Sequence, residues 1–404
     1  MKQHLVIIGA GHAAAQLILN LVQSQYGAAI TVITEDSHAF YQRPPLSKQF
    51  LKDDQASIQS LIGPALLERH GITTLASTHI TGIDTDEKCV QLASGENVGY
   101  TQLVFATGSE PRHLADLPSD LDNVHRLRSY TDAQALRHAL SPATTVAIIG
   151  AGFIGLEIAA TARELGKEVV IFEREARVLP HRVSPEIATF LLAQHRQQGV
   201  NVHLESTDIN YQIAKQRITS ITCNGARVTP DVVVIGIGGA PRTTLAQQIG
   251  IHCDNGILVD ENMQTSVPDI YAIGDCMISR GVGQTSFRRL ESVQNANDSA
   301  RVLAHHLTGQ VAPPATIPWF WSTQGNIHLQ IAGLPQAHTE TVNKKTDNPD
   351  SFSILHFAEE RLVCVETINH PADHLAARKL IALADQPGRA QLADKNLSLR
   401  SHLV

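Results

Sequence analysis

The sequence predicts an α/β chain with two successive parallel-sheet units, followed by a smaller C-terminal α+β segment. A pattern of buried strand, glycine-rich turn and helix occurs first over residues 5–14 and again over residues 145–157. Such strand–turn–helix units build parallel sheets. After the tandem prolines Pro313 and Pro314, short alternating strands lead into a helix expected over 372–384, without a further glycine-rich turn. The last segment therefore has a different architecture.

Composition excludes several broad classes of protein. The 404-residue chain has 43% hydrophobic and 18% charged residues, which is ordinary for a globular protein. Its net charge of −7 argues against binding to nucleic acid, because such proteins are usually basic. We find no apolar run of ~18 residues and no basic, apolar leader. We therefore expect a cytoplasmic protein that does not bind a membrane.

The first turn has the pattern Gly-x-Gly-x-x-Ala. Gly9 permits the sharp bend, Gly11 lets the backbone approach a pyrophosphate, and Ala14 lets the helix pack closely on the strand. The next strand, expected over 29–34, ends at Glu35. A carboxylate about 20 residues after such a turn can bind an adenosine ribose, although a solvated strand end is the plainer interpretation. This pattern predicts a dinucleotide site without saying which dinucleotide binds.

The second turn repeats the pattern in full as Gly150-x-Gly152-x-x-Gly155. A helix is expected over 156–165, and the strand after it ends at Glu173, again at the spacing of a ribose contact. Two copies are far more specific than one. They predict two dinucleotides that exchange electrons, a flavin held permanently and a nicotinamide that comes and goes.

Other segments add features around these turns. The prolines in Arg43-Pro44-Pro45-Leu46-Ser47-Lys48 predict a rigid, extended segment. Strands are expected to end in glycine at 103–108, 231–239 and 267–276. A helix expected over 291–307 would carry partial positive charge at its N-terminus.

Together these motifs resemble the FAD-dependent pyridine-nucleotide:disulfide oxidoreductases, and within them the NADH–ferredoxin reductases of aromatic-ring dioxygenases and some cytochromes P450. The similarity covers essentially the whole chain and rests on residues 9–11, 43–48, 106–108, 150–157, 271–275, 291–296 and 318–322. It implies a fold of the glutathione-reductase type, with two Rossmann-like domains and a C-terminal α+β domain. The implied boundaries are 1–110 with 242–312 for FAD, 111–241 for NADH, and 313–404 for an interface or dimerisation-like domain.

The resemblance also implies the cofactor contacts. Lys48 would lie near the flavin N5 edge, and Asp275 would bind the ribityl chain. The residues assigned to FAD are Gly9, Gly11, Ala13, Ala14, Glu35, Arg43, Lys48, Ile80, Ala106, Thr107, Gly108, Arg128, Gly274, Asp275, Glu291, Ser292 and Val293. The residues assigned to NADH are Gly150, Gly152, Phe153, Ile154, Gly155, Glu157, Glu173, Arg177, Gly236, Ile237 and Gly238. One departure is Gln42, where family members are expected to have an acid.

Four residues are assigned to the chemistry: Lys48, Glu157, Trp319 and Trp321. Glu157, in the first turn of the expected helix, would pair with Lys48 or hold the nicotinamide carboxamide. An acid in a first turn is favourable in any helix, which is the alternative explanation. The tryptophans would lie on the electron route or simply pack at a domain junction.

Cysteines and histidines limit the alternatives. The five cysteines are scattered without a Cys-x-x-Cys pair, which argues against a metal cluster or a redox dithiol. The first of them, Cys89, follows the Arg-Pro-Pro segment, which argues against a disulfide reductase, an NADH oxidase or a peroxidase. His370 and His374 have chelating spacing, but a solvated helix face is the simpler interpretation, and no metal is predicted.

The predicted partner is a small [2Fe-2S] ferredoxin of an oxygenase system, and the chain is expected to be a monomer or a homodimer. A rubredoxin reductase, a P450-ferredoxin reductase or a relative of monodehydroascorbate reductase remain as alternatives. An NADH-sensing charge-transfer flavoprotein related to apoptosis-inducing factor is the alternative from another class. Glu173 favours NADH, although Arg174 and Arg177 could accept a 2′-phosphate. Candidate docking cations are Arg288, Arg289, Arg378 and Lys379.

Overall fold

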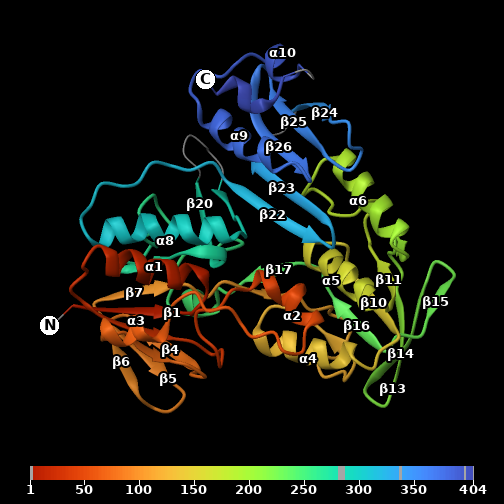
Figure 1. Ribbon diagram of the computed structural model, residues 1–404. Coiled ribbons are helices and arrows are strands. Elements are labelled where there is room, and N and C mark those ends of the chain that lie inside the picture. The colour runs from red at the N-terminus through yellow and green to blue at the C-terminus, as the bar shows by residue number, and fades with distance from the viewer. Residues whose placement is uncertain (1–2, 281–286, 336–338, 395–396, 404) are drawn as a thin grey trace. The chain divides into compact units, whose positions relative to one another are not determined.

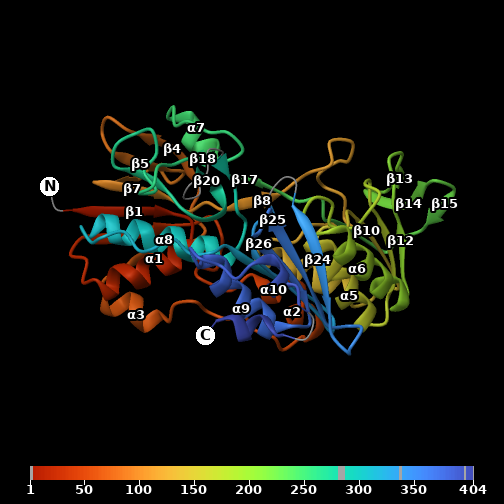
Figure 2. The ribbon, with the colours of Figure 1, turned by 90° about the horizontal axis from the view of Figure 1, so that it is seen from above.

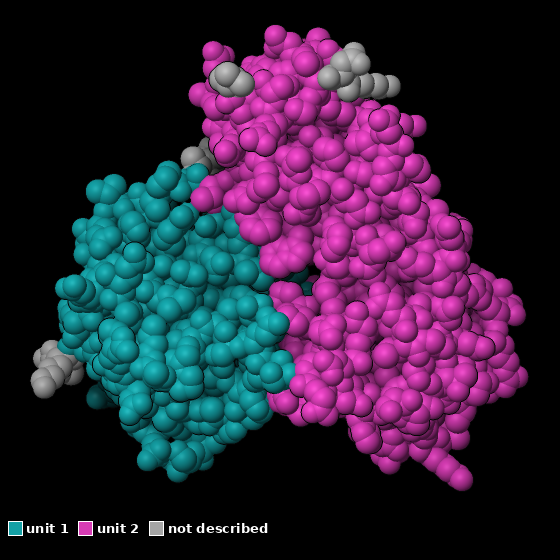
Figure 3. Space-filling model, viewed as in Figure 1, with its two compact units in different colours: residues 1–43, 57–110, 239–315 teal, residues 44–56, 111–238, 316–404 magenta. Residues whose placement is uncertain are grey.

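The computed structural model describes residues 3–280, 287–335, 339–394 and 397–403 (Figure 1). Its contacts divide the chain into two compact units (Figure 3). Unit 1 contains residues 1–43, 57–110 and 239–315, and unit 2 contains residues 44–56, 111–238 and 316–404. Each unit is thus assembled from segments that are distant in the sequence. No helix within the described ranges is long and apolar enough to cross a membrane.

Unit 1 is built on a five-stranded sheet in the order β19-β7-β1-β2-β3, whose paired strands are all parallel. Leu5, Val6 and Ile7 of the central strand are fully buried, which explains its uninterrupted apolar sequence. The predicted opening strand and the strand that leads to Glu35 are both confirmed. The strands are β1 (His4–Ile8), β2 (Ala29–Ile33), β3 (Thr73–Leu75), β7 (Gln102–Phe105) and β19 (Ile270–Ala272).

Two helices of unit 1 that are far apart in the sequence lie side by side, as Figures 1 and 2 both show. They are α1 (His12–Gln23) and α8 (Val293–Leu307), and their apolar residues join one core with the sheet. The predicted helix over 291–307 is confirmed, with its start at Val293 and a cap at Ser292, whose side chain accepts from the Asn295 amide.

Smaller elements complete unit 1. An antiparallel sheet contains β4 (Ile80–Asp84), β5 (Cys89–Leu92) and β6 (Asn97–Gly99). The others are α3 (Pro64–Arg69), β8 (Ser109–Pro111), β17 (Gly239–Pro241), α7 (Thr244–Gln248), β18 (Ile257–Leu258), η2 (Gly274–Cys276), β20 (Met277–Arg280) and β21 (Phe287–Arg288).

Unit 2 contains a second parallel sheet, in the order β12-β11-β10-β16-β9. The strands are β9 (Val124–His125), β10 (Thr145–Ile149), β11 (Glu168–Phe172), β12 (Val200–His203) and β16 (Val232–Ile235). Its helices are α2 (Gln49–Lys52), α4 (Tyr130–Leu140), α5 (Phe153–Glu164) and α6 (Pro185–Gln197). A short antiparallel sheet holds β13 (Asn210–Ala214), β14 (Arg217–Cys223) and β15 (Ala226–Val228).

The C-terminal part of unit 2 is an antiparallel sheet in the order β22-β23-β26-β25-β24, packed on α9 (Pro371–Ala382). Its strands are β22 (Trp319–Gln324), β23 (Ile327–Gly333), β24 (Glu340–Lys345), β25 (Phe352–Ala358) and β26 (Arg361–Ile368). It ends with α10 (Arg389–Leu392) and η3 (Leu399–His402). The predicted α+β character is confirmed, but the strand formed by the tryptophan motif was not foreseen.

The proline segment differs from the prediction. Instead of an extended chain, Pro44–Ser47 forms a 3₁₀ helix, η1. The fixed φ of proline, near −65°, fits a 3₁₀ helix as well as an extended chain, so the prolines alone could not decide between them. The 3₁₀ turn leads directly to Lys48 and then to α2, and it thereby fixes where Ser47 and Lys48 lie in unit 2.

Candidate functional site

The first glycine turn is closely packed in unit 1. Gly9 has φ +105°, and a Cβ there would lie 2.3 Å from the carbonyl oxygen of Ala106. A Cβ at Gly11 would instead meet only the Arg43 guanidinium, at 3.9 Å. Gly11 is also the N-cap of α1 and has no side chain to satisfy the first helical amides. The turn therefore has the open amides and the nearby cation that fit the pyrophosphate of FAD.

Among the other predicted FAD residues of unit 1, Gly274 packs against the helix that follows this turn. A Cβ on Gly274 would lie 3.0 Å from the Cβ of Ala13, so η2 packs directly on α1. The Gly274 amide donates to Ser299 Oγ of α8 at 3.0 Å, which brings Asp275 to the N-terminal half of that helix. Ile80 is buried at the start of β4. Lys48 and Arg128 belong to unit 2, and their predicted contacts with the flavin stay predictions.

Glu35 lies two residues beyond the end of β2, and half of its side chain is exposed. Its Oε1 is 2.6 Å from His79 Nδ1, and its Oε2 accepts from Arg242 Nη1 at 3.3 Å. Arg242 also lies 3.4 Å from Glu110. The carboxylate is thus half exposed and flanked by basic side chains, and its remaining acceptor positions could bind ribose hydroxyls. Sequence patterns had not indicated Arg242.

In the second turn, in unit 2, two positions must be glycine because a side chain there would collide with the backbone. A Cβ on Gly150, at φ +100°, would lie 2.6 Å from the Gly236 carbonyl oxygen. A Cβ on Gly155 would lie 2.3 Å from the Gly150 carbonyl oxygen. Gly152 is the N-cap of α5 and leaves the helical amides uncapped by its own side chain. Ile154, in the first turn of α5, is 43% exposed, so an apolar side chain faces solvent next to the glycine turn.

Glu173 is engaged differently from Glu35. It is buried, and its two oxygens accept from the amides of Ala151 at 2.6 Å and Glu175 at 2.9 Å. The carboxylate therefore braces the glycine turn. A carboxylate has about four acceptor positions, so Glu173 can still bind ribose hydroxyls. The neighbouring Arg174 is ion-paired with Glu175 at 3.1 Å.

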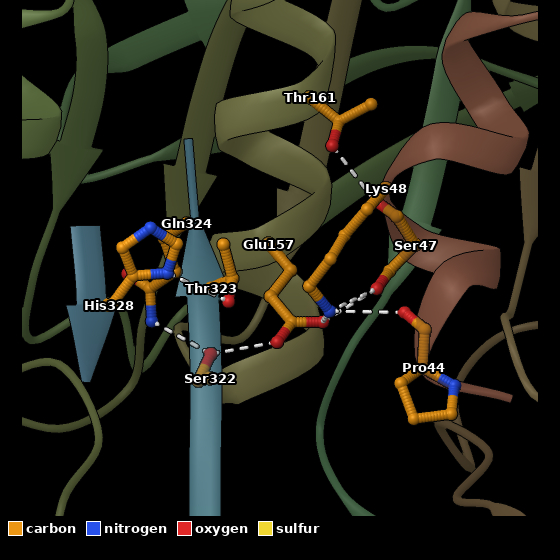
Figure 4. Close-up of polar contacts among 9 residues, drawn as sticks. All are labelled: Pro44, Ser47, Lys48, Glu157, Thr161, Ser322, Thr323, Gln324 and His328. Carbon is orange, nitrogen blue, oxygen red and sulfur yellow. Dashed lines mark hydrogen bonds and ion pairs between the residues drawn. The ribbon is translucent and has the colours of Figure 1, made fainter. Parts of the chain in front are cut away.

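Lys48 and Glu157 form the central ion pair of unit 2 (Figure 4). Lys48 Nζ lies 2.6 Å from Glu157 Oε2 and also donates to the Pro44 carbonyl and to Ser47 Oγ, each at 3.1 Å. The Glu157 side chain is 6% exposed and that of Lys48 is 22% exposed. The predicted pairing is present. However, α5 begins at Phe153, so Glu157 lies one turn inside the helix, and the expectation of a first-turn position was wrong.

Two serines complete the carboxylate shell. Ser47 Oγ donates to Glu157 Oε2 at 2.6 Å, and Ser322 Oγ donates to Oε1 at 2.7 Å. The Ser47 carbonyl in turn accepts from Thr161 Oγ1 of α5 at 2.8 Å. A buried carboxylate needs a counter-charge and hydrogen bonds to offset its lost hydration, and Glu157 has both. The two serines stand within the proline and tryptophan motifs, but nothing in the sequence joined them to Glu157.

With this geometry established, known proteins allow a decision on the family. The model of the pyridine nucleotide-disulphide oxidoreductases matches residues 3–300, and a reductase C-terminal model matches residues 319–403. The chain belongs to the pyridine nucleotide-disulphide oxidoreductase family. Members of this family bind FAD and take electrons from a nicotinamide, in agreement with the two turns.

Several relatives are similar over nearly their whole length. Rhodocoxin reductase from Rhodococcus erythropolis is 37% identical, over 98% of this chain and 93% of that protein. Terpredoxin reductase from Pseudomonas sp. is 34% identical, over 98% and 97%. Among solved structures, the ferredoxin reductase for the CYP199A2 system of Rhodopseudomonas palustris has a TM-score of 0.94 at 36% identity, covering 99% of both chains. The covalent putidaredoxin reductase–putidaredoxin complex also has a TM-score of 0.94, at 31% identity and over 99% and 98%.

The cysteines of this chain do not form the disulphide after which the family is named. All five cysteines lie in described parts of the chain, and none forms a disulfide. Burial raises the pKa of the Cys276 and Cys364 thiols, so neither is poised as a thiolate nucleophile. Across the described residues, no group of acidic, cysteine and histidine side chains could hold a metal.

Both tryptophans lie on β22 in unit 2, on one face of the strand because they are two residues apart. Their rings stack with centroids 5.3 Å apart, and the Arg378 guanidinium lies over Trp319 at 4.7 Å. His374 meets the edge of Trp319 at 5.7 Å and is buried, so the expectation that it lies on a solvated face was wrong. Burial, followed by the charge of Arg378, lowers the pKa of His374 to about 4.

The candidate docking cations differ in accessibility. The Arg289 side chain is only 8% exposed and is ion-paired with Glu291 at 2.6 Å, so its assignment as a docking residue was wrong. Arg288 and Lys379 are exposed, and Arg378 is half-buried over Trp319.

Proposed function

We propose that this flavoprotein transfers electrons from NADH, through FAD, to a small [2Fe-2S] ferredoxin that supplies a Rieske-type aromatic-ring dioxygenase. The Lys48–Glu157 pair carries this proposal, because it holds a carboxylate and a cation at the helix that follows the second glycine turn, whereas the five cysteines form no disulfide. The full-length similarity to rhodocoxin and terpredoxin reductases supports a redoxin as the acceptor.

We assign the FAD site to residues 1–110 and 242–312, the NADH site to residues 111–241, and the C-terminal domain to residues 313–404. Around FAD, the amides after Gly11 and the Arg43 guanidinium would bind the pyrophosphate, and Glu35 the adenosine ribose. The N-terminus of α8 has no acid in its first turn, and its partial positive charge favours an electron-rich ligand edge. When bound, FAD accepts a hydride and releases single electrons.

For NADH, the amides after Gly152 would bind the pyrophosphate and Glu173 the ribose. We place the nicotinamide carboxamide against Glu157, whose carboxylate is fixed by Lys48 and two serines. A carboxylate held in this way accepts from the carboxamide NH₂ group without first having to lose water or reorient. The role of the chain is thus to orient the donor and keep a cation beside it, with no proton transfer required.

A P450 system is the second candidate destination, because the similar solved reductase from Rhodopseudomonas palustris belongs to the CYP199A2 system. The reductase chemistry would be unchanged, and only the redoxin and the oxygenase would differ. Supplying the purified ferredoxin with either a dioxygenase or a P450 and measuring product formation separates the two.

The deciding experiment is anaerobic mixing of the purified protein with NADH, followed by oxidised [2Fe-2S] ferredoxin. We expect bound flavin, rapid loss of its visible absorbance with one NADH per flavin, and fast return of that absorbance when ferredoxin is added. A protein without flavin would contradict the proposal. Slow bleaching with a long-lived coloured complex would instead favour the NADH sensor, and preference for rubredoxin would favour a rubredoxin reductase.

A further inference from the structure

Behind Ser322, unit 2 contains two buried polar residues that the proposed chemistry does not use. Gln324 lies two residues along β22 and is 1% exposed, and His195 on α6 is fully buried. Gln324 Nε2 donates to Ser322 Oγ at 3.3 Å, and Gln324 Oε1 lies 2.8 Å from His195 Nε2. Ser322 then donates to Glu157 Oε1 at 2.7 Å. Figure 4 shows the hydrogen bonds that connect Gln324 through Ser322 to Glu157.

The donors in this series of hydrogen bonds can point in only one direction. An ionised carboxylate is acceptor-only, so the single Ser322 proton is directed to Glu157 and its oxygen accepts from Gln324. The amide nitrogen of Gln324 therefore faces Ser322, and its oxygen faces His195. His195 must then donate through Nε2, which makes it the neutral Nε2–H tautomer. Burial lowers the pKa of His195, in agreement with a neutral ring.

We infer that Gln324 and His195 are positioning residues for Glu157, and that they form a one-way relay of donors which holds Oε1 while Lys48 and Ser47 hold Oε2. The two oxygens are then restrained by different elements: Oε2 by the η1 segment, and Oε1 by β22 with α6 behind it. This inference rests on the proposed role of Glu157 towards nicotinamide. It predicts that losing the relay misorients the nicotinamide while the rest of NADH stays bound.

The substitution Gln324→Met removes both polar ends at nearly constant volume. We expect the rate constant for flavin reduction by saturating NADH to fall roughly tenfold, the order expected for one buried hydrogen bond. The dissociation constant of NAD⁺, measured by calorimetry, should change less than twofold, because the adenosine half binds elsewhere. The long-wavelength absorbance of the reduced flavin with NAD⁺ should also change, which a purely structural role would not cause.

Two conservative variants separate donor direction from packing. Gln324→Glu keeps the acceptor for His195 but replaces the donor to Ser322 with a second acceptor, so it should slow reduction at least as much as Gln324→Met. His195→Gln retains an N–H donor and should keep most of the rate. If Gln324→Met does not fold, the difference in flavin reduction rate between Gln324→Glu and His195→Gln still tests the relay.

The matched control is Ser353→Ala. Ser353 is fully buried in β25 of the same sheet and donates to Asp373 at 2.8 Å, with no link to Glu157. It should lower thermal stability without altering the reduction rate. Wild-type rates and spectra in both Gln324 variants, with slow reduction in Glu157→Gln, would overturn the relay. If Glu157→Gln itself reduces flavin normally, the proposed role of Glu157 fails instead.

Discussion

Ser322 Oγ donates a 2.7 Å hydrogen bond to Glu157 Oε1 across 165 residues of sequence. The bond joins β22 of the C-terminal sheet to α5 of the second glycine-turn domain, within unit 2. It makes the C-terminal sheet a part of the nicotinamide site that we propose, although that sheet has no dinucleotide turn of its own.

Removing this bond should therefore affect function as well as stability. In Ser322→Ala, Glu157 keeps Ser47 and Lys48 but loses the donor to Oε1, at a cost of about 1–2 kcal/mol in unfolding free energy. We expect slower flavin reduction by NADH, measured by anaerobic stopped flow, with ferricyanide turnover reduced in proportion. Unchanged reduction kinetics would show that the β22 side of the shell is dispensable.

Lys48 and Glu157 should be energetically coupled. Lys48→Met leaves the buried Glu157 without its counter-charge, and Glu157→Gln leaves the partly buried Lys48 without one, whereas the double variant removes both charges. A double-mutant cycle on urea unfolding should give a coupling energy of about 1–3 kcal/mol, because the pair is largely removed from water. A coupling energy near zero would mean that each charge is hydrated equally well without its partner, so the ion pair adds no stability.

Gly155→Ala should impair the second turn. The added Cβ would lie 2.3 Å from the Gly150 carbonyl oxygen, so α5 must move away from β10. We expect NADH binding, measured by calorimetry, to weaken at least tenfold while flavin content stays near wild type. Gly27→Ala is the control, because a Cβ there has no neighbour within 4 Å. Equal affinity in the two variants would contradict the assignment of this turn.

NADH should be preferred over NADPH. Glu173 lies at the end of β11, and a carboxylate there repels a 2′-phosphate, while Arg174 is occupied by Glu175. Steady-state kcat/KM at matched ionic strength tests this prediction. Comparable efficiency with both coenzymes would show that Arg174 or Arg177 accepts the phosphate.

Stability should fall in mild acid because of His374. Its pKa is about 4 in the folded protein and near 6.5 when unfolded, so below pH 6.5 the unfolded chain binds more protons. The loss should reach about 2 kcal/mol at pH 5. Urea unfolding at pH 7.5 and pH 5.0 should show a smaller difference in His374→Leu than in the wild type. If the variant and the wild type lose the same unfolding free energy between pH 7.5 and pH 5.0, groups other than His374 cause the acid sensitivity.

Small ferredoxins are usually acidic, so docking needs local cations on this protein, and ferredoxin reduction should slow as salt increases. Lys379→Glu should lower the second-order rate constant several-fold at low salt, and the difference should vanish at high salt. Lys345→Glu makes the same charge change on β24, away from the tryptophan strand in the sheet order, and should have little effect. A rate that does not depend on ionic strength would argue against Lys379 as a docking residue.

Sequence patterns were sufficient for features that lie within one segment. The turns at Gly9 and Gly150 could be predicted because a strand, a glycine spacing and a helix follow one another directly. The strands that end at Glu35 and Glu173 could be predicted for the same reason. The proline segment could not, because the φ of proline suits both an extended chain and the 3₁₀ helix observed at Pro44–Ser47.

By itself, the sequence determined the α/β class, the two dinucleotide turns and the lack of a Cys-x-x-Cys motif. Only the tertiary structure decided what surrounds Glu157: Ser47 and Lys48 from one segment, and Ser322, Gln324 and His195 from two others. The physical reason is that periodicity and motif spacing report neighbours along the chain. Hydrogen bonds between distant elements depend on packing, which no single segment specifies.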